Sequence, residues 1–278
     1  MDRKTTDFSD WVGRTRTARW LLTGDLVRKF AATLNLDPPA DGADAPLGCL
    51  WIGGGDEVAT KDLAEDGHAP KGGFLPPIAL PSRMWAGGEL TFLAPLKPGA
   101  DIERKTTIVR VTEKEGKSGK LAFVDLRHDY RNADRDCLSE MQTLVFTEGR
   151  KKAAVAPPAA PAGPWDDEES LTPCPVLLFR YSALTFNSHR IHYDRDYARD
   201  HEGYEDMVVH GPLMATLLLR HCERRFGADP LKRFSFRGVS PAFAGRPLKV
   251  VSRGGETVEL AIIGHDGRVV MKGEAKRK

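Results

Sequence analysis

The chain has 278 residues, which is long for one domain and comfortable for two of about 140 residues each. Its 41 Lys and Arg side chains nearly balance 39 Asp and Glu, so the formal net charge is only +2. No basic stripe with interleaved aromatic residues occurs, and nucleic-acid binding is therefore not expected. The four cysteines (Cys49, Cys137, Cys174 and Cys222) are widely separated. This argues against a disulfide framework or a structural zinc site and favours a reducing compartment.

The amino-terminal segment, residues 1–7, is polar and lacks the apolar stretch of a signal peptide. No run approaches the roughly 18 apolar residues that a membrane-spanning helix needs. The sequence therefore predicts a soluble cytoplasmic protein that does not associate with a membrane.

The first part of the chain predicts one helix followed by loops. The helix lies within residues 18–36, with Thr23 as a suitable N-cap. Asp37-Pro38-Pro39 ends it, because a proline disfavours helix at the residue before it. Residues 50–52 are a candidate strand, and the glycine-rich and proline-rich residues 60–80 are typical of loop.

From residue 85 to residue 147 apolar residues recur with a period of two, which indicates an antiparallel sheet. The predicted strands are residues 89–93, 101–111, 121–130 and 137–146, with a turn at residues 115–120.

Residues 151–164 consist mainly of proline and alanine, which indicates an extended linker. We place the boundary there, between an N-terminal domain (residues 1–150) and a C-terminal domain (residues 165–278). The second half begins with an acidic segment, and residues 176–180 are a strand or the start of a helix. Four more strands are predicted at residues 234–240, 247–252, 257–263 and 269–274, with a hairpin at residues 264–267.

An internal repeat supports two similar halves. A shift of 146 residues places Pro95 on Pro241 and Gly99 on Gly245. The same shift places residues 187 and 192 in the proline- and glycine-rich loop at residues 38–48. The first half therefore has no counterpart of the polar cluster described next. We expect it to complete the sheet and to form a wall of the pocket that holds this cluster.

The polar cluster lies between residues 180 and 217. Asn187, His189, Arg190 and His192 fall within six residues, and His210-Gly211-Pro212 follows at the start of an apolar run typical of a buried helix. Imidazole moves protons near neutral pH. Free N–H groups at a helix start can hold a developing oxyanion. The cluster therefore suits a substrate with a carbonyl group.

The pattern Phe186-Asn187-x-His189-Arg190-Ile191-His192 with His210-Gly211 downstream resembles the MaoC-like (R)-specific enoyl-thioester hydratases. Their motif is Gly-Asp-x-Asn-Pro-(aliphatic)-His. The residues of this motif are closer to those of the type 2 hydroxyacyl-thioester dehydratases and of the mesaconyl-CoA and itaconyl-CoA hydratases. The resemblance extends to Leu80-Pro-Ser-Arg-Met-Trp-Ala-Gly-Gly88 and to Phe236-Arg-Gly-Val-Ser-Pro-Ala-Phe-Ala-Gly245.

The resemblance implies an α+β protein with a double hot-dog fold, in which each half wraps an antiparallel sheet around a helix. It implies catalytic roles for His192 as general acid and base, for Asn187 as a hydrogen-bonding partner of water, and for Gly211 as the oxyanion donor. Asn187 stands where the wider family has aspartate, and a carboxamide cannot exchange a proton at useful pH. A structural role in a turn is the alternative for Asn187.

His189, Arg190 and His210 are candidate substrate-binding residues. Arg190 suits a phosphate or a substrate carboxylate, and an ion pair with Asp194 or Asp196 is the alternative. His210 is alternatively a residue that orients the turn. No metal is expected, because His189 and His192 lack a third ligand at a convincing spacing. The resemblance implies that no other cofactor is needed.

The implied activity is the reversible hydration of an α,β-unsaturated acyl-CoA, with mesaconyl-CoA or itaconyl-CoA as the favoured substrate. Three alternatives stay open. They are a 3-hydroxyacyl-thioester dehydratase of the fatty-acid type, a hot-dog thioesterase, and a non-catalytic acyl-thioester-binding subunit. The expected partner is the acyl-CoA substrate, and the resemblance also allows a homodimer.

Overall fold

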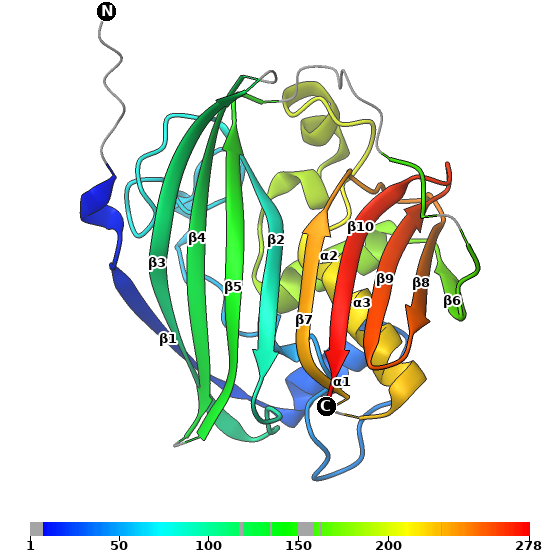
Figure 1. The fold of residues 1–278 in the computed structure, drawn as a ribbon. Coiled ribbons are helices and arrows are strands. Elements are labelled where there is room, and N and C mark those ends of the chain that lie inside the picture. The colour runs from blue at the N-terminus through cyan, green and yellow to red at the C-terminus, as the bar shows by residue number, and fades with distance from the viewer. Residues whose placement is uncertain (1–7, 117–118, 134, 150–157, 162, 229) are drawn as a thin grey trace, which may run out of the picture.

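The computed structural model describes residues 8–116, 119–133, 135–149, 158–161, 163–228 and 230–278. Within them, ten strands form one antiparallel sheet in the order β1-β3-β4-β5-β2-β7-β10-β9-β8-β6 (Figure 1). The strands are β1 (Thr15–Leu22), β2 (Ser82–Phe92), β3 (Ala100–Gly116), β4 (Gly119–Asn132), β5 (Arg135–Thr147), β6 (Asp167–Leu171), β7 (Leu231–Gly238), β8 (Leu248–Gly254), β9 (Thr257–Gly264) and β10 (Val269–Arg277). The strands predicted from the period of two are confirmed as β2 to β5, and the four predicted in the second half as β7 to β10.

The two halves of the sheet repeat one topology. The first half has the order β1-β3-β4-β5-β2, and the second has the corresponding order β6-β8-β9-β10-β7. Gly99 and Gly245, which the internal repeat aligns, have φ angles of +86° and +77° just before β3 and β8. The N–H of Gly99 donates to Leu22 O, and that of Gly245 donates to Pro173 O, each over 2.7 Å. This agreement confirms the double hot-dog prediction.

The halves meet where β2 pairs with β7. Gly87 is paired with Arg237 and Gly88 with Phe236. A Cβ on Gly87 would lie 2.5 Å from Phe236 O, so only glycine allows the strands to approach this closely. The main hydrophobic core is also shared, because it contains Leu90 of the first half and Phe234 of the second.

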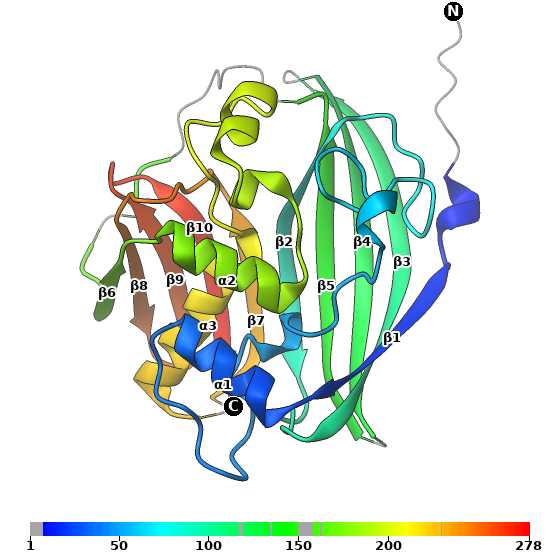
Figure 2. The same cartoon turned by 180° about the vertical axis from the view of Figure 1, so that it is seen from behind.

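Three helices lie on the same face of the sheet (Figure 2). They are α1 (Gly24–Thr33), α2 (Pro175–Thr185) and α3 (Gly211–Phe226). Thr23 caps α1 as predicted, because its Oγ1 accepts a hydrogen bond from Leu26 N over 3.0 Å. The residues of α3 are mostly buried over its first twelve positions, so the apolar run after His210 is confirmed as a buried helix. The chain between α1 and β2 crosses the face of the first-half strands (Figure 2).

Several local predictions need correction. Residues 50–52 are not a strand, because Cys49–Trp51 form a 3-10 turn that begins at Gly48, with φ +94°. At Gly48 the backbone turns toward α3, since an added Cβ would lie 2.8 Å from Thr216 Cγ2. Residues 15–22 form β1, and the helix predicted within residues 18–36 is confirmed as α1, which begins after its cap Thr23. Residues 176–180 lie in α2. The predicted turn at residues 115–120 includes residues 117 and 118, which lie outside the described residues.

The domain division stays a prediction. Most of the linker at residues 151–164 lies outside the described residues, since 151–157 and 162 are not among them. The described part includes a β-bridge between Ala159 and Arg268.

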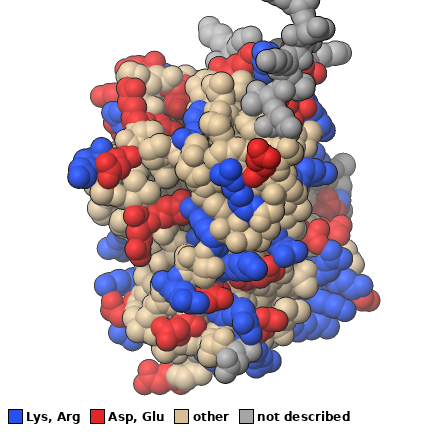
Figure 3. Space-filling model, turned by 90° about the vertical axis from the view of Figure 1, so that its left-hand side faces the viewer, with Lys and Arg blue, Asp and Glu red and all other residues tan. Residues whose placement is uncertain are grey.

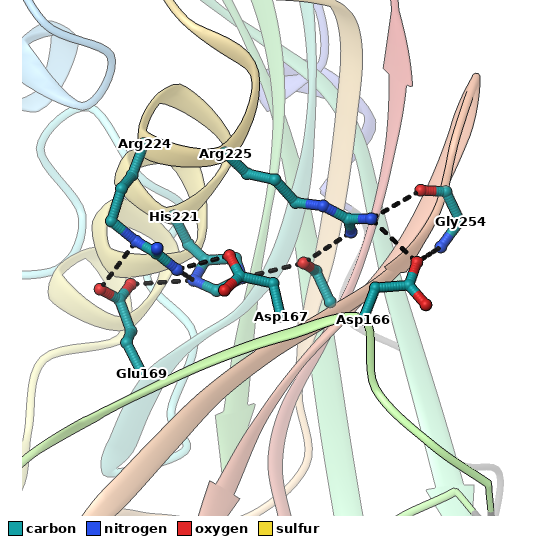
Figure 4. A network of polar contacts seen from close by, with 8 residues as sticks. Asp166, Asp167, Glu169, His221, Arg224, Arg225 and Gly254 are labelled. Carbon is teal, nitrogen blue, oxygen red and sulfur yellow. Dashed lines mark hydrogen bonds and ion pairs between the residues drawn. The ribbon is translucent and has the colours of Figure 1, made fainter.

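The acidic segment before α2 forms β6 and is joined to the end of α3 by polar contacts (Figure 4). His221 is fully buried, with Nδ1 2.9 Å from Glu169 Oε1 and Nε2 2.9 Å from Ser252 Oγ. Arg224 pairs with Asp167, and Arg225 with Asp166. Because every acidic side chain except Glu168 meets α3, these charges explain why a segment without apolar alternation becomes an edge strand.

Charges on the side of the molecule that contains β1 and β3 are mixed in sign (Figure 3). Ion pairs link Arg19 to Glu103 across β1 and β3, and Arg127 to Asp129 within β4. Charges of both signs are therefore interspersed among the described residues of this face. Among the described residues, no helix is both long and apolar enough to cross a membrane.

Candidate active site

A cavity of about 750 Å³ opens between the helices and the sheet, and both halves of the chain line it. The first half supplies Trp51, His68, Arg83, Trp85, His128 and Tyr130, among others. The second half supplies Asn187, His189, His192, Gly211 and Arg237, among others. Four of the six predicted site residues therefore lie together at one cavity. Arg190 and His210 are not part of its lining.

His192 lies on the 3-10 turn Arg190–His192 and is 7% exposed. Its Nδ1 is 2.7 Å from Val208 O. A carbonyl oxygen only accepts, so Nδ1 carries the hydrogen and Nε2 keeps its lone pair. Burial lowers the pKa of His192 to about 4, although the bond to Val208 opposes this. The ring is therefore neutral at neutral pH, which is the form that a general base requires.

Asn187 follows the end of α2, where Phe186 has a left-handed φ of 51°. Asn187 Oδ1 accepts a hydrogen bond from His189 N over 3.0 Å. The side chain thus holds the turn that carries the histidines, as the structural alternative predicted. Its Nδ2 has no hydrogen-bond partner among the described residues, so this amide group is a donor available to the cavity.

Gly211 is the first residue of α3, and its N–H has no acceptor among the described residues. Such a free N–H at a helix start carries the positive end of the helix dipole. A Cβ at this position would lie 3.1 Å from Trp85 Cε3. Glycine therefore keeps the approach to this N–H open between the helix and β2.

His210 is fully buried behind His192 and does not reach the cavity, which corrects the expectation that it contacts substrate. Its ring stacks on that of His192, with centroids 3.6 Å apart and planes at 20°. His210 Nε2 is 2.8 Å from Ser182 Oγ of α2. The alternative, in which His210 orients the turn, agrees with these contacts, since the side chain holds His192 from behind.

Arg190 also differs from its expected role. Its guanidinium donates to Asp194 Oδ2 through Nε and Nη2, over 3.0 and 2.7 Å, and it lies 4.0 Å from the ring centroid of Tyr197. A further bond of 3.3 Å runs to Glu65 O. The Arg190 side chain therefore contacts Asp194 and Tyr197, and it is not part of the cavity lining. The ion-pair alternative describes this residue.

A loop of the first half reaches the same turn. Asp66 and His68 lie beside His189, and the rings of His68 and His189 are 4.1 Å apart. His68 Nδ1 is 2.9 Å from Asp66 Oδ2. Burial raises the pKa of Asp66, but the hydrogen bonds and charge of His68 outweigh it and the net shift is strongly downward. Burial lowers the pKa values of both imidazoles, to about 2 for His189. At neutral pH the ionised carboxylate of Asp66 thus lies beside the uncharged imidazoles of His68 and His189.

The model of the type 2 hydroxyacyl-thioester dehydratases matches residues 56–244. The chain belongs to this family. A mesaconyl-C(4)-CoA hydratase of Chloroflexus aurantiacus is 39% identical over 271 residues, which cover 95% of this chain and 96% of that protein. The family and this relative, which aligns over nearly its whole length, show that the chain is a hydro-lyase that acts on an acyl thioester.

Two solved structures share the fold of this family member. A MaoC-like dehydratase from Phytophthora capsici aligns with a TM-score of 0.70 and 17% identity, over 95% of this chain and 94% of that one. A Mycobacterium tuberculosis protein with a double hot-dog fold aligns with a TM-score of 0.59 and 14% identity, over 96% of each chain.

Three residues near the site of this dehydratase-family chain were not predicted from the sequence, namely Asp66, His68 and Arg83. The stretch that resembles the family at residues 80–88 contains Arg83, and this was a usable signal for that residue. No such signal marks Asp66 and His68, which lie in a loop without periodicity and reach His189 only through the fold.

Replacing Asn187 with Asp restores the residue type of the wider family. The carboxylate oxygens can still accept from His189 N, so the turn should persist. The Nδ2 donor, however, becomes a negative charge. Because the exchange removes the donor assigned to Asn187, we expect kcat to fall and the pH profile of kcat/KM to change. An unchanged rate together with an unchanged profile would remove position 187 from the site.

Proposed function

We propose that this protein catalyses the reversible hydration of a short, branched dicarboxylic acyl-CoA, with mesaconyl-CoA as the first candidate. The name of the relative that is 39% identical supports this substrate. The observation that carries the proposal is Arg83, a partly buried arginine of the cavity lining without an ion-pair partner among the described residues.

The other arginines of the lining differ from Arg83. Arg16 pairs with Asp56 over 2.8 Å, and Arg104 donates to Gly54 O over 2.7 Å. Arg237 is exposed to solvent. Burial lowers the pKa of Arg83, although the charges of Asp66 and Asp56 oppose this. A desolvated guanidinium without a fixed counter-ion suits a carboxylate supplied by the substrate.

The chemistry assigns one role to each of three groups. The Gly211 N–H holds the thioester oxygen and stabilises the enolate that forms as water adds to the β-carbon. His192 Nε2 takes a proton from the attacking water and returns it to the α-carbon. Asn187 Nδ2 donates a hydrogen bond within the same cavity. The proton returned equals the proton removed, so the enzyme ends in its starting state.

The test compares Arg83→Met with Arg190→Met. A hydrogen bond between a charged group and its partner is worth roughly 1.5–3 kcal/mol, or about ten- to a hundredfold in affinity. We expect Arg83→Met to lower kcat/KM for mesaconyl-CoA by about that factor relative to crotonyl-CoA. Arg190→Met removes an arginine outside the cavity and should leave the ratio of the two specificity constants unchanged. Equal losses on both substrates in Arg83→Met would contradict the dicarboxylate assignment.

A further inference from the structure

The turn that carries the second-half histidines is docked onto a loop of the first half. Ser188 Oγ donates to Gly67 O over 2.5 Å, and Arg190 N donates to Asp66 O over 2.9 Å. Gly67 has a left-handed φ of +87°, and a Cβ there would lie 1.9 Å from Ser188 O. Only glycine fits this contact, so the loop at residues 64–68 is fixed against the turn rather than resting loosely on it.

Asp66 fixes the orientation of His68. The carboxylate accepts from the backbone N–H of His68 through Oδ1 and contacts Nδ1 through Oδ2, each over 2.9 Å. An ionised carboxylate only accepts hydrogen bonds, so Nδ1 of His68 carries the hydrogen. Nε2 of His68 then has a lone pair, and it has no hydrogen-bond partner among the described residues. His192 has the same tautomer, with Val208 O in place of the carboxylate.

His189 supplies the second observation. It is 93% buried, since its exposed fraction is 7%, and its Nε2 is inaccessible and has no hydrogen-bond partner among the described residues. A buried polar atom without a partner is costly and usually contacts a water or a ligand group. The ring lies between those of His68 and His192, at 4.1 and 5.5 Å, and all three line the cavity.

From this arrangement we propose that His68, beside His189, binds the reacting water, or the β-hydroxyl of the hydrated product, and that Asp66 positions His68 for this contact. His68 Nε2 accepts one O–H of the water, and His192 takes the proton of the other. The water oxygen bonds to the β-carbon, the electron pair of the double bond passes to the thioester oxygen, and the proton on His192 moves to the α-carbon. His68 gains and loses no proton. The inference rests on the proposed function and adds a catalytic residue from the first half.

The same atoms raise one competing assignment. Ligand atoms of Asp66, His68 and His189 lie within 4.8 Å of one another, and a carboxylate with two imidazoles can hold a divalent metal ion. The direct contact between Asp66 and His68 favours a carboxylate–imidazole pair instead, because one Asp66 oxygen and His68 Nδ1 are then already used on each other.

The experiment measures kcat and KM for mesaconyl-CoA with four variants. His68→Ala removes the acceptor, and we expect kcat to fall about ten- to a hundredfold with KM changed less than threefold. His68→Gln places a carbonyl oxygen in reach of the water and should recover part of the loss. Asp66→Asn should invert the His68 tautomer, because an amide can donate to Nδ1. It should therefore lower kcat and change the pH profile. His265→Ala, on the exposed β9–β10 hairpin, is the matched control and should behave as wild type.

The outcomes separate this inference from the proposed function. If the wild type hydrates mesaconyl-CoA and folded His68→Ala keeps more than half of its kcat, the inference is wrong and the proposed function stands. If the wild type hydrates no enoyl-CoA, the proposed function fails. A wild-type activity that is lost in EDTA and restored by Zn²⁺ would also overturn the inference, since these atoms would then hold an ion. Activity that persists in EDTA supports it.

Discussion

His192→Asn should lower kcat for hydration of an enoyl-CoA by about a hundredfold or more, the usual effect of losing an acid–base group. The amide of Asn can still donate to Val208 O, so the contact that holds the turn is retained. What disappears is Nε2, the only atom of the His192 side chain assigned to proton transfer. A protein that keeps its thermal unfolding midpoint and loses turnover would locate the loss in chemistry. The same substitution at the exposed His265 provides the control.

The pH dependence of wild-type kcat/KM should show where His192 titrates. Its pKa is lowered to about 4 by burial. The neutral ring is the base, so the rate should be independent of this group above about pH 5 and should fall as the pH drops through about 4. An acid limb near pH 6.5, the ordinary value for histidine, would show that the base is a solvated imidazole.

Near-wild-type turnover in a folded His192→Asn protein would contradict the mechanism outright.

Cleavage of the chain within residues 151–157 should leave an active complex, and separation of the two pieces should abolish activity. The halves share the β2–β7 pairing and one hydrophobic core. His192 and Gly211 come from the second half, whereas Arg83 comes from the first. For this experiment a protease site is inserted in this segment, and the protease is added before any denaturant. Activity should persist after nicking, vanish when the pieces are separated in denaturant, and return when they are refolded together.

Each piece refolded alone provides the control for this experiment. The second-half piece exposes the edge of β7 and the core face that Leu90 covers in the whole chain, so we expect it to aggregate or self-associate. A monomeric and fully active fragment of residues 165–278 would contradict a cavity built by both halves.

The sheet was predictable because its signal is local. Alternation of apolar residues marks β2 to β5, and the repeat that aligns Gly99 with Gly245 extends to the strand order of both halves. Elements that depend on tertiary contacts were not predictable in the same way. The edge strand β6 has no apolar alternation and is held by ion pairs to α3. Cys49–Trp51 turns where Gly48 packs against α3, a contact that no pattern in the sequence indicates.

The candidate site likewise contains residues that a local pattern indicates and residues that only tertiary contacts bring there. Asn187 and His192 lie in one short motif, Gly211 follows 19 residues later, and the resemblance to a known family motif was the signal that grouped them. All three line one cavity. The direction of a side chain on a turn is not encoded by spacing, so Arg190 was assigned to substrate although it pairs with Asp194. His68 reaches the site through a loop about 120 residues earlier in the chain, tied there by the bond from Ser188 Oγ to Gly67 O. Such long-range contacts follow from the fold and not from a local pattern.

We propose that water is added to a dicarboxylic enoyl thioester in a cavity built by both halves. The most direct measurement follows mesaconyl-CoA incubated with the wild-type protein by two signals at once, the absorbance of the conjugated thioester and the release of free thiol. We predict that the absorbance falls to an equilibrium level and that no thiol appears. Thiol released in step with the absorbance loss would mean thioester hydrolysis, and no change in either signal would mean binding without catalysis; each result would contradict the account.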